Sequence, residues 1–535
     1  MTTIDTHAGA SAGAAQTNAV VRAATWIFSS DHKKIGRLMV GEGIVATVAA
    51  AVIGALLGLE RMSAGHSIFA EGATPQLVSL FQYLLVFGVL APFTIGLAVA
   101  VAPLQVGSRS LSFPRLAVFG RCAWTFGTIL VIVSAIGNGG PAGGTTDLVD
   151  LYLLAVVLSS AGLVAVAVSV ATTILTSRAP GMTTDLLPSF SWGSLVGTVA
   201  TALSLPVLVG TTIYLYVDHT YAKAAFGGNS DISKWMHSGF TQPATYVFAA
   251  IAAAIVAEIA PVAAGARQPL RGAVYAGLGL ISTGLLGAVT QSQHVLNTDG
   301  ALADKVKSAV PFLLFNALPV LGLLVVLGTA VLVLKEGSLK VGAALAFALL
   351  GNGMILLGML GTLIQNISAT GLSGTSLEEG ATTFVVYGAV LAGVGGLLHW
   401  APKLWGVLIE DTISLPVLGL AVVGTVLAGL GNFIAGFAGQ PVEAVDGFTY
   451  DGPRGLWNIL VAGGHVLVAV SLVAVALGIF TAVKGGANAS DDPWNGHTLE
   501  WATTSPAPRD NFATVATVGS AEPVLDAKPN SEVSA

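Results

Sequence analysis

Charged residues and cysteine are scarce in this chain of 535 residues. Asp, Glu, Lys and Arg make up 9% of it, whereas hydrophobic residues make up 54% and the mean hydropathy is +0.80. This balance lies outside the range of soluble globular domains. The single cysteine, Cys122, excludes an intrachain disulfide and a thiolate-bound metal cluster within this chain. No basic patch supports binding to nucleic acid.

Twelve hydrophobic segments are long enough to cross a lipid bilayer as helices. They lack the alternation of membrane strands, and backbone groups in hydrocarbon must be bonded within their own segment or a closed barrel. The sequence therefore predicts an all-α polytopic membrane protein, a bundle of twelve transmembrane helices. The expected spans are residues 37–59, 77–103, 119–137, 150–176, 190–217, 243–265, 270–295, 308–334, 340–364, 382–399, 412–436 and 456–484.

The distribution of basic residues predicts the orientation of these spans. Most of the 22 Lys and Arg fall on the same side as the N-terminus, which the positive-inside rule assigns to the cytoplasm. Both termini are therefore expected in the cytoplasm, with the chain in the plasma membrane. We expect a disordered cytoplasmic leader at 1–24, the twelve-helix transmembrane domain at 25–490 and a cytoplasmic tail at 491–535, disordered from 513 onward.

Five sequence motifs follow one another along these spans. They are WIFSSDHKKIGR at 26–37, PLQVGSRSLSFPRLA at 103–117, the region 239–296, HWAPKLWG at 399–406 and DDPWNGHTLEWATTSPAPRDNF at 491–512. In this order they resemble the heme-copper oxidase superfamily, and specifically subunit I of cytochrome c oxidase. The resemblance implies the twelve-helix fold of that subunit, partners among respiratory-complex subunits, and heme and copper as the family's cofactors.

The metal-binding positions of that family are occupied here by other residues. The resemblance implies six histidine ligands, because neutral imidazole suits heme iron and copper. Counting from the motifs places Phe81, Gln242, Gln293, His294, Gly380 and Thr382 at these six positions. Only His294 retains the ligand. The chain is therefore interpreted as a divergent member that lacks most heme and copper ligands, and no heme or copper is expected.

The polar residues left inside the spans suggest two further features. A polar cavity is expected around Gln242, Tyr246, Gln293 and His294, although His294 equally fits a hydrogen-bonded or interfacial position and Tyr246 fits simple packing. Glu42 and Glu258 lie within spans, where ionisable groups are costly. Both are candidates for proton transfer, with snorkelling or an internal hydrogen bond as the alternative.

Three functions follow from this pattern. The first is a non-catalytic accessory or assembly component of a respiratory membrane complex. The second is an active terminal oxidase-type subunit with unconventional ligands. The third is a proton or small-solute pathway that reuses the vacated cofactor cavity.

Overall fold

The structure is a computed structural model that describes most of the chain. Described are residues 21–22, 24–62, 68–69, 72–225, 232–240, 244–338, 340–445, 447–450, 452–485, 488–515 and 517–528, without the side chains of 238, 244 and 286. The leader expected at 1–24 falls almost entirely outside the described residues. Gln242 lies outside them as well.

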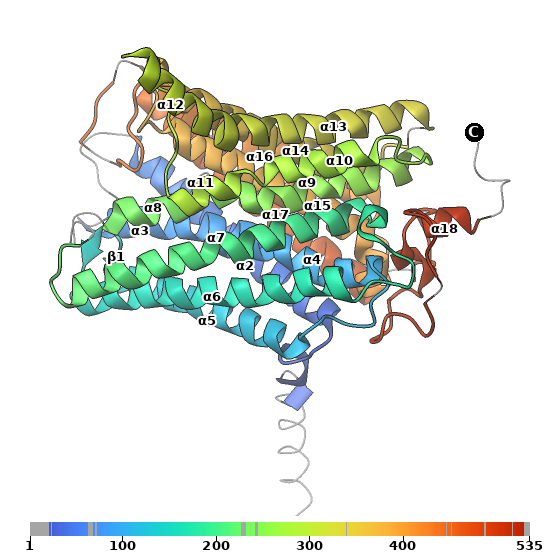
Figure 1. The fold of residues 1–535 in the computed structure, drawn as a ribbon. Coiled ribbons are helices and arrows are strands. Elements are labelled where there is room, and N and C mark those ends of the chain that lie inside the picture. Colours follow the sequence, from blue (N-terminus) through green and yellow to red (C-terminus); the bar gives the residue numbers. More distant parts are fainter. Residues whose placement is uncertain are drawn as a thin grey trace, which may run out of the picture.

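Long helices run side by side along the whole molecule (Figure 1). The prediction of an all-helical polytopic membrane protein is confirmed. The long helices and helix series are α2 (His32–Glu60), α3–η1–α4 (Ala73–Tyr83, Leu84–Leu90, Ala91–Gln105), α5 (Pro114–Ile136), α6 (Thr146–Thr176), α7 (Ser189–Thr220), α9 (Ala244–Ala264), α12–η4–α13 (Leu302–Phe312, Leu313–Ala317, Leu318–Glu336), α14 (Ala343–Gln365), α15 (Leu377–Trp405), α16 (Asp411–Phe437) and α17 (Arg454–Gly485).

Short elements connect these helices. They are β1 (Gly139–Gly140), β2 (Gly143–Gly144), η2 (Thr184–Leu186), α8 (Ile232–Phe240), α10 (Arg271–Ile281), α11 (Gly284–Thr290), η5 (Ser368–Thr370), η6 (Leu499–Ala502) and α18 (Pro523–Asp526). β1 and β2 form a small antiparallel hairpin.

Eleven helices of the described residues are long and apolar enough to cross a membrane. The seventh expected span, 270–295, is instead divided into α10 and α11. The break falls at Ser282 and Thr283, whose hydroxyls donate to the carbonyls of Gly279 and Leu280 at 2.6 and 2.8 Å. Such local hydroxyl-to-carbonyl bonds offer the backbone an alternative to the regular helix.

Three helices form the centre of the bundle. The most apolar stretches of α3–α4 and α15 are wholly buried, and that of α9 is 89% buried. Glycines allow α14 to approach α15 closely: a Cβ added at Gly351 would lie 2.4 Å from the Ala392 nitrogen, and one at Gly388 would lie 2.6 Å from the Gly351 oxygen. Small residues serve this purpose in membrane bundles, where helix association depends on close packing.

The C-terminal tail covers one end of the bundle, drawn in red in Figure 1. We call this the tail end, and the opposite end, near α3, α8 and α12, the far end. Asn511 accepts a hydrogen bond at its Oδ1 from Lys33 at 2.9 Å and donates to the Ser108 carbonyl at 2.7 Å. Residues 517–528, expected to be disordered, also pack here: the Val518 nitrogen donates to the Pro180 carbonyl at 2.8 Å. The tail is more ordered than its polar, proline-rich sequence predicts because it bonds to loop carbonyls that its own sequence does not reveal.

Candidate functional site

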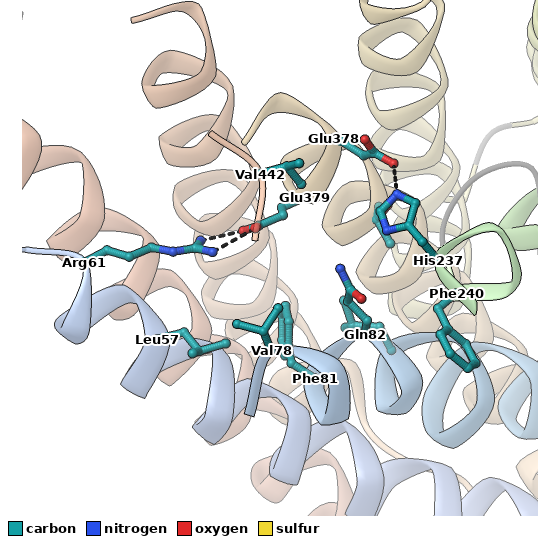
Figure 2. Close-up of a pocket in the computed structure, with 12 residues that line it drawn as sticks. Leu57, Arg61, Val78, Phe81, Gln82, His237, Phe240, Glu378, Glu379 and Val442 are labelled. Atoms are coloured by element: carbon teal, nitrogen blue, oxygen red, sulfur yellow. Dashed lines mark hydrogen bonds and ion pairs between the residues drawn. The ribbon is translucent and has the colours of Figure 1, made fainter. Parts of the chain in front are cut away.

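Two adjacent carboxylates open α15 at the far end of the bundle. Glu378 and Glu379 occupy the first turn of this helix. Negative side chains are favourable there because the free N–H groups of a helix N-terminus carry partial positive charge. Consecutive residues point in directions about 100° apart on a helix of 3.6 residues per turn. The two carboxylates therefore face different partners (Figure 2).

His237 on α8 lies between Glu378 and Glu443. Its Nε2 is 2.7 Å from Oε1 of Glu378, and its Nδ1 is 2.8 Å from Oε1 of Glu443. Burial alone would lower the pKa of His237, but the hydrogen bonds to Glu378 and Glu443 outweigh it and raise the pKa to about 10. His237 is therefore an imidazolium at neutral pH, since only the protonated ring donates from both nitrogens.

Three glutamine amides complete the hydrogen bonding of these two carboxylates. Gln293 and Gln365 donate to Glu378 at 2.7 and 3.0 Å. Gln82 donates to Glu443 at 2.7 Å. Burial would raise the pKa of Glu443, but the hydrogen bond and the charge of His237 lower it below its ordinary value. Glu443 is thus held in the ionised form.

Arg61 pairs with the second carboxylate of α15. Its guanidinium bonds both oxygens of Glu379, at 2.5 and 2.8 Å, and its Nε donates to the Ala444 carbonyl at 2.9 Å. The Glu443 nitrogen also donates to Glu379, at 2.7 Å. The side chains of Arg61 and Glu379 are only 3% and 11% exposed. Such a two-pronged arginine–carboxylate pair fixes geometry as well as charge.

A small pocket lies beneath this polar layer, as Figure 2 shows. The volume open to the centre of a water molecule is about 20 Å³. That is room for about one water. Apolar side chains form its inner wall: Leu57, Val78, Phe81, Leu85 and Phe240. The site is thus a compact layer of three carboxylates, one arginine and one imidazolium above a packed apolar core.

A family model described as cytochrome c and quinol oxidase polypeptide I matches residues 34–486 of the chain. The chain belongs to this family. It is 27% identical to a putative cytochrome c oxidase subunit 1-beta of Streptomyces avermitilis, over 94% of this chain and 91% of the relative. It is 26% identical to a cytochrome c oxidase subunit 1 of Corynebacterium diphtheriae (93% and 91% covered) and 25% to one of Bacillus subtilis (93% and 82% covered).

The position at which the oxidase resemblance places a heme ligand on the second span is occupied by Phe81 of α3. Its ring meets that of His465 on α17 edge to face, with centroids 5.5 Å apart. Nδ1 of His465 is in turn 2.8 Å from the Tyr387 hydroxyl. Phe81, His465 and Tyr387 are 7%, 1% and 1% exposed. This family position is therefore part of a closely packed aromatic group.

The resemblance assigns two oxidase ligand positions on α15 to Gly380 and Thr382. A Cβ added at Gly380 would lie 2.6 Å from Cδ1 of Phe433 and 2.7 Å from the Gly429 oxygen. Gly380 thus marks a close approach of α16 to α15. Thr382 is 7% exposed and lines the pocket of Figure 2.

The side chains of Gln293 and His294, which follow α11, have different partners. Gln293 donates to Glu378 and so joins the far-end network. His294 instead has its Nε2 2.7 Å from the Thr290 hydroxyl, and its ring lies 4.5 Å from that of Phe315. Burial lowers the pKa of His294. This placement agrees with the hydrogen-bonded alternative for His294.

Tyr246 is fully buried on α9 and packs against α11: a Cβ added at Gly284 would lie 2.8 Å from the Tyr246 Cβ. Because Gln242 is outside the described residues, the polar cavity expected around it stays a prediction.

The two glutamates expected inside spans lie in different surroundings. Glu42 accepts hydrogen bonds from Arg121 at 2.8 Å and from Thr125 at 3.0 Å. Glu42 is thus hydrogen-bonded within the protein, and its role in proton transfer stays a prediction. Glu258 is 6% exposed and lies near the tail end, far along α9 from Tyr246.

Sequence reasoning missed the central residues of the far-end site. His237 lies in a short segment between two spans, and Glu378 and Glu379 lie just before the expected start of the tenth span. Their signal was present: two consecutive carboxylates directly before a long apolar run need cationic partners if the helix start is buried.

Proposed function

We propose that this member of the cytochrome c and quinol oxidase polypeptide I family works without heme or copper, as an accessory or assembly component of a respiratory membrane complex. The observation that carries the proposal is the packing of Phe81 against His465, with ring centroids 5.5 Å apart. Protein interiors are close-packed, so a family scaffold without its cofactors must refill their volume with side chains. Phe81, His465 and Tyr387 supply such a filling.

His465 is the buried histidine next to this position, but its surroundings do not suit an iron ligand. Its Nδ1 is 2.8 Å from the Tyr387 hydroxyl. Its Nε2 faces α2, where a Cβ added at Gly54 would lie only 2.8 Å away. A heme whose iron is bonded to Nδ1 would have to displace Tyr387. A heme whose iron is bonded to Nε2 would have to displace the α2 backbone.

The opposite side of a heme at this place offers no ligand either. Heme iron is held by histidine, cysteine, methionine or tyrosine side chains. Gly380 and Thr382 supply none of these. A larger side chain at Gly380 would also collide with Phe433, 2.6 Å from an added Cβ. The residues present therefore do not fit a heme with two axial ligands.

The charge of the far-end site also disfavours a bound heme. Glu378, Glu379 and Glu443 carry three negative charges against the two positive charges of Arg61 and His237. Heme propionates near this layer would add further negative charge. Like charges in a buried site disfavour one another strongly. The charged groups of the layer form ion pairs with one another, and these pairs stabilise the helix ends without a ligand.

We place the chain in the plasma membrane, with both termini cytoplasmic, among lipid and the other subunits of a respiratory complex. The excess of Lys and Arg on the side of the termini supports this orientation. The relatives from Streptomyces, Corynebacterium and Bacillus are named as oxidase subunits, which supports an assembly of several chains.

Heme and metal analysis of the full-length protein, purified from its native membrane, tests the proposal. We expect neither a Soret band nor iron or copper in proportion to protein, and we expect respiratory-complex subunits to co-purify with the tagged chain. A family member with all six histidines, prepared in parallel, is the control for cofactor loss during purification. One heme per chain together with oxygen consumption would establish instead an active oxidase with unconventional ligands.

A further inference from the structure

Two carboxylates from distant parts of the chain are buried together at the tail end. Glu258 lies near the end of α9, and Glu500 lies in η6 of the tail. They are 6% and 0% exposed. Thr498, two residues before Glu500, donates to Oε1 of Glu258 at 3.2 Å. The tail thus brings its own carboxylate to the end of a central helix.

The two carboxylates differ in their hydrogen bonds. Glu258 accepts at both oxygens, from the Phe190 nitrogen at 3.0 Å and from the Thr498 hydroxyl. Glu500 accepts only at Oε1, from Gln105 at 2.9 Å and from the Trp400 indole at 3.2 Å. Its Oε2 is buried and has no hydrogen-bond partner among the described residues. This pattern fits an ionised Glu258, whose two oxygens both have donors, and a Glu500 protonated at Oε2, where no described group donates; the carboxyl O–H then needs an acceptor such as water.

The nearby cations make their hydrogen bonds to other groups. Arg271 bonds Glu522 at 3.2 Å and the Leu187 carbonyl at 3.3 Å. Lys403 bonds the carbonyls of Asp491 and Thr503. Arg267 pairs with Glu522 and Asp526, and Lys528 pairs with Asp492.

These pairs leave the charges of Glu258 and Glu500 without a bonded cation in the described structure. Two negative charges buried together without a bonded cation disfavour one another. Burial raises the pKa of Glu500 above its ordinary value. One proton on the pair removes the repulsion.

A small polar pocket connects Glu258 with the tail surface. The volume open to the centre of a water molecule is about 20 Å³, and its lining includes Glu258, Gln268, Arg271, His497 and Glu522. Gln268 and His497 are 8% and 3% exposed, yet neither amide atom of Gln268 and neither ring nitrogen of His497 has a hydrogen-bond partner within the part of the chain that the structure describes. Unpaired buried polar groups cost about 1–3 kcal/mol each. Ordered water in the pocket would satisfy them.

We propose that Glu258 and Glu500 form a proton-binding site that holds one proton at neutral pH, with the proton on Oε2 of Glu500 and with Glu258, which lines the Gln268–His497 pocket, as the link to water at the tail surface. A hydronium ion in the pocket gives its proton to Glu258, which passes it to Glu500; at each transfer one O–H bond breaks as the next forms, and the pair changes from two negative charges to one. The site requires neither heme nor copper and does not depend on the proposed accessory role.

His497 acts in this site as a neutral hydrogen-bonding group. Burial, followed by the charges of Lys528 and Arg267, lowers the pKa of His497 to about 4. At neutral pH its ring therefore presents one donor and one acceptor to water. Glu522 also lines the pocket and is paired with Arg267 and Arg271.

Infrared titration of the full-length protein in lipid nanodiscs tests the site. We expect a protonated-carboxyl band at pH 7 that shifts in D₂O, because pocket water contacts Glu258, which exchanges the proton with Glu500. E500Q should remove this band. E258Q should keep it but move its titration midpoint to lower pH, since the repulsion is gone. E336Q, which removes an exposed carboxylate at the end of α13, should leave the band unchanged.

Three results would overturn the proposal. They are a wild-type protein without a protonated-carboxyl band at pH 7, a band that persists in E500Q, and a band that does not respond to D₂O. If E500Q fails to fold, E258Q decides, because an unchanged midpoint in that variant shows that the two carboxylates do not interact.

Discussion

The Arg61–Glu379 pair offers the sharpest test of how the far end is stabilised. Arg61 makes two bonds to Glu379, at 2.5 and 2.8 Å, and one to the Ala444 carbonyl at 2.9 Å. Its replacement by methionine leaves Glu379, 11% exposed, as a buried charge without its cation. Loss of one partner from a buried pair costs about 3–5 kcal/mol. This lowers the folding equilibrium constant by roughly a hundred-fold to a few thousand-fold.

Reversible unfolding in mixed micelles of increasing SDS content, followed by tryptophan fluorescence, measures this loss. The double variant R61M/E379Q should recover part of the stability, because replacing both partners removes the unpaired charge. R115M removes an exposed arginine at the start of α5 and serves as the control, expected within about 0.5 kcal/mol of the wild type. The reasoning is refuted if R61M matches R115M, or if the losses of R61M and E379Q simply add in the double variant.

Three further predictions concern pH, packing and the aromatic group. The pKa of His237 in the folded protein is about 10, above its ordinary value of 6.5. In the same unfolding assay, the free energy by which wild type is more stable than H237Q should therefore be complete below pH 6.5 and be lost as the pH rises through 10. A difference that does not change with pH would contradict the double ion pair. G351A should destabilise by about 1–3 kcal/mol through overpacking between α14 and α15. G353A on the same helix, where an added Cβ meets nothing within 4 Å, should not, and equal effects would refute the packing argument. F81A should cost about 3–5 kcal/mol as a core cavity, far more than F119A on the exposed face of α5, and similar losses would mean that Phe81 is not packed as described.

Hydropathy predicted most of the bundle because length and composition alone make a membrane helix. The expected span 77–103, for example, lies within the continuous helix series Ala73–Gln105. The division of span 270–295 was not predicted, because it depends on the hydroxyl bonds of Ser282 and Thr283 rather than on hydrophobicity. Local side-chain bonding of this kind is invisible to an average over a window.

The far-end network was beyond sequence reasoning for a different reason. Its bonds join residues that are distant in the chain: His237 and Glu443 are separated by 206 positions, and Gln293 and Glu378 by 85. The motif count did single out Gln293, but as a vacated ligand position. Its actual partner, Glu378, follows only from the three-dimensional packing of α11 against α15.

The contacts of the C-terminal tail could not be predicted from the sequence either. Its motif at 491–512 predicted family membership but not that Glu500 would be buried against Gln105 and Trp400. A polar, proline-interrupted segment predicts an exposed surface loop, and only the fold shows that it packs against the tail end of the bundle.

A cryo-electron microscopy map of the chain purified from its native membrane tests the central claim most directly. The account predicts density for the Phe81 ring edge-on to His465, with Tyr387 bonded to that histidine and side chains filling the space between α3 and α15. A planar macrocycle in this space, with iron coordinated by His465 or by any other residue, would contradict it.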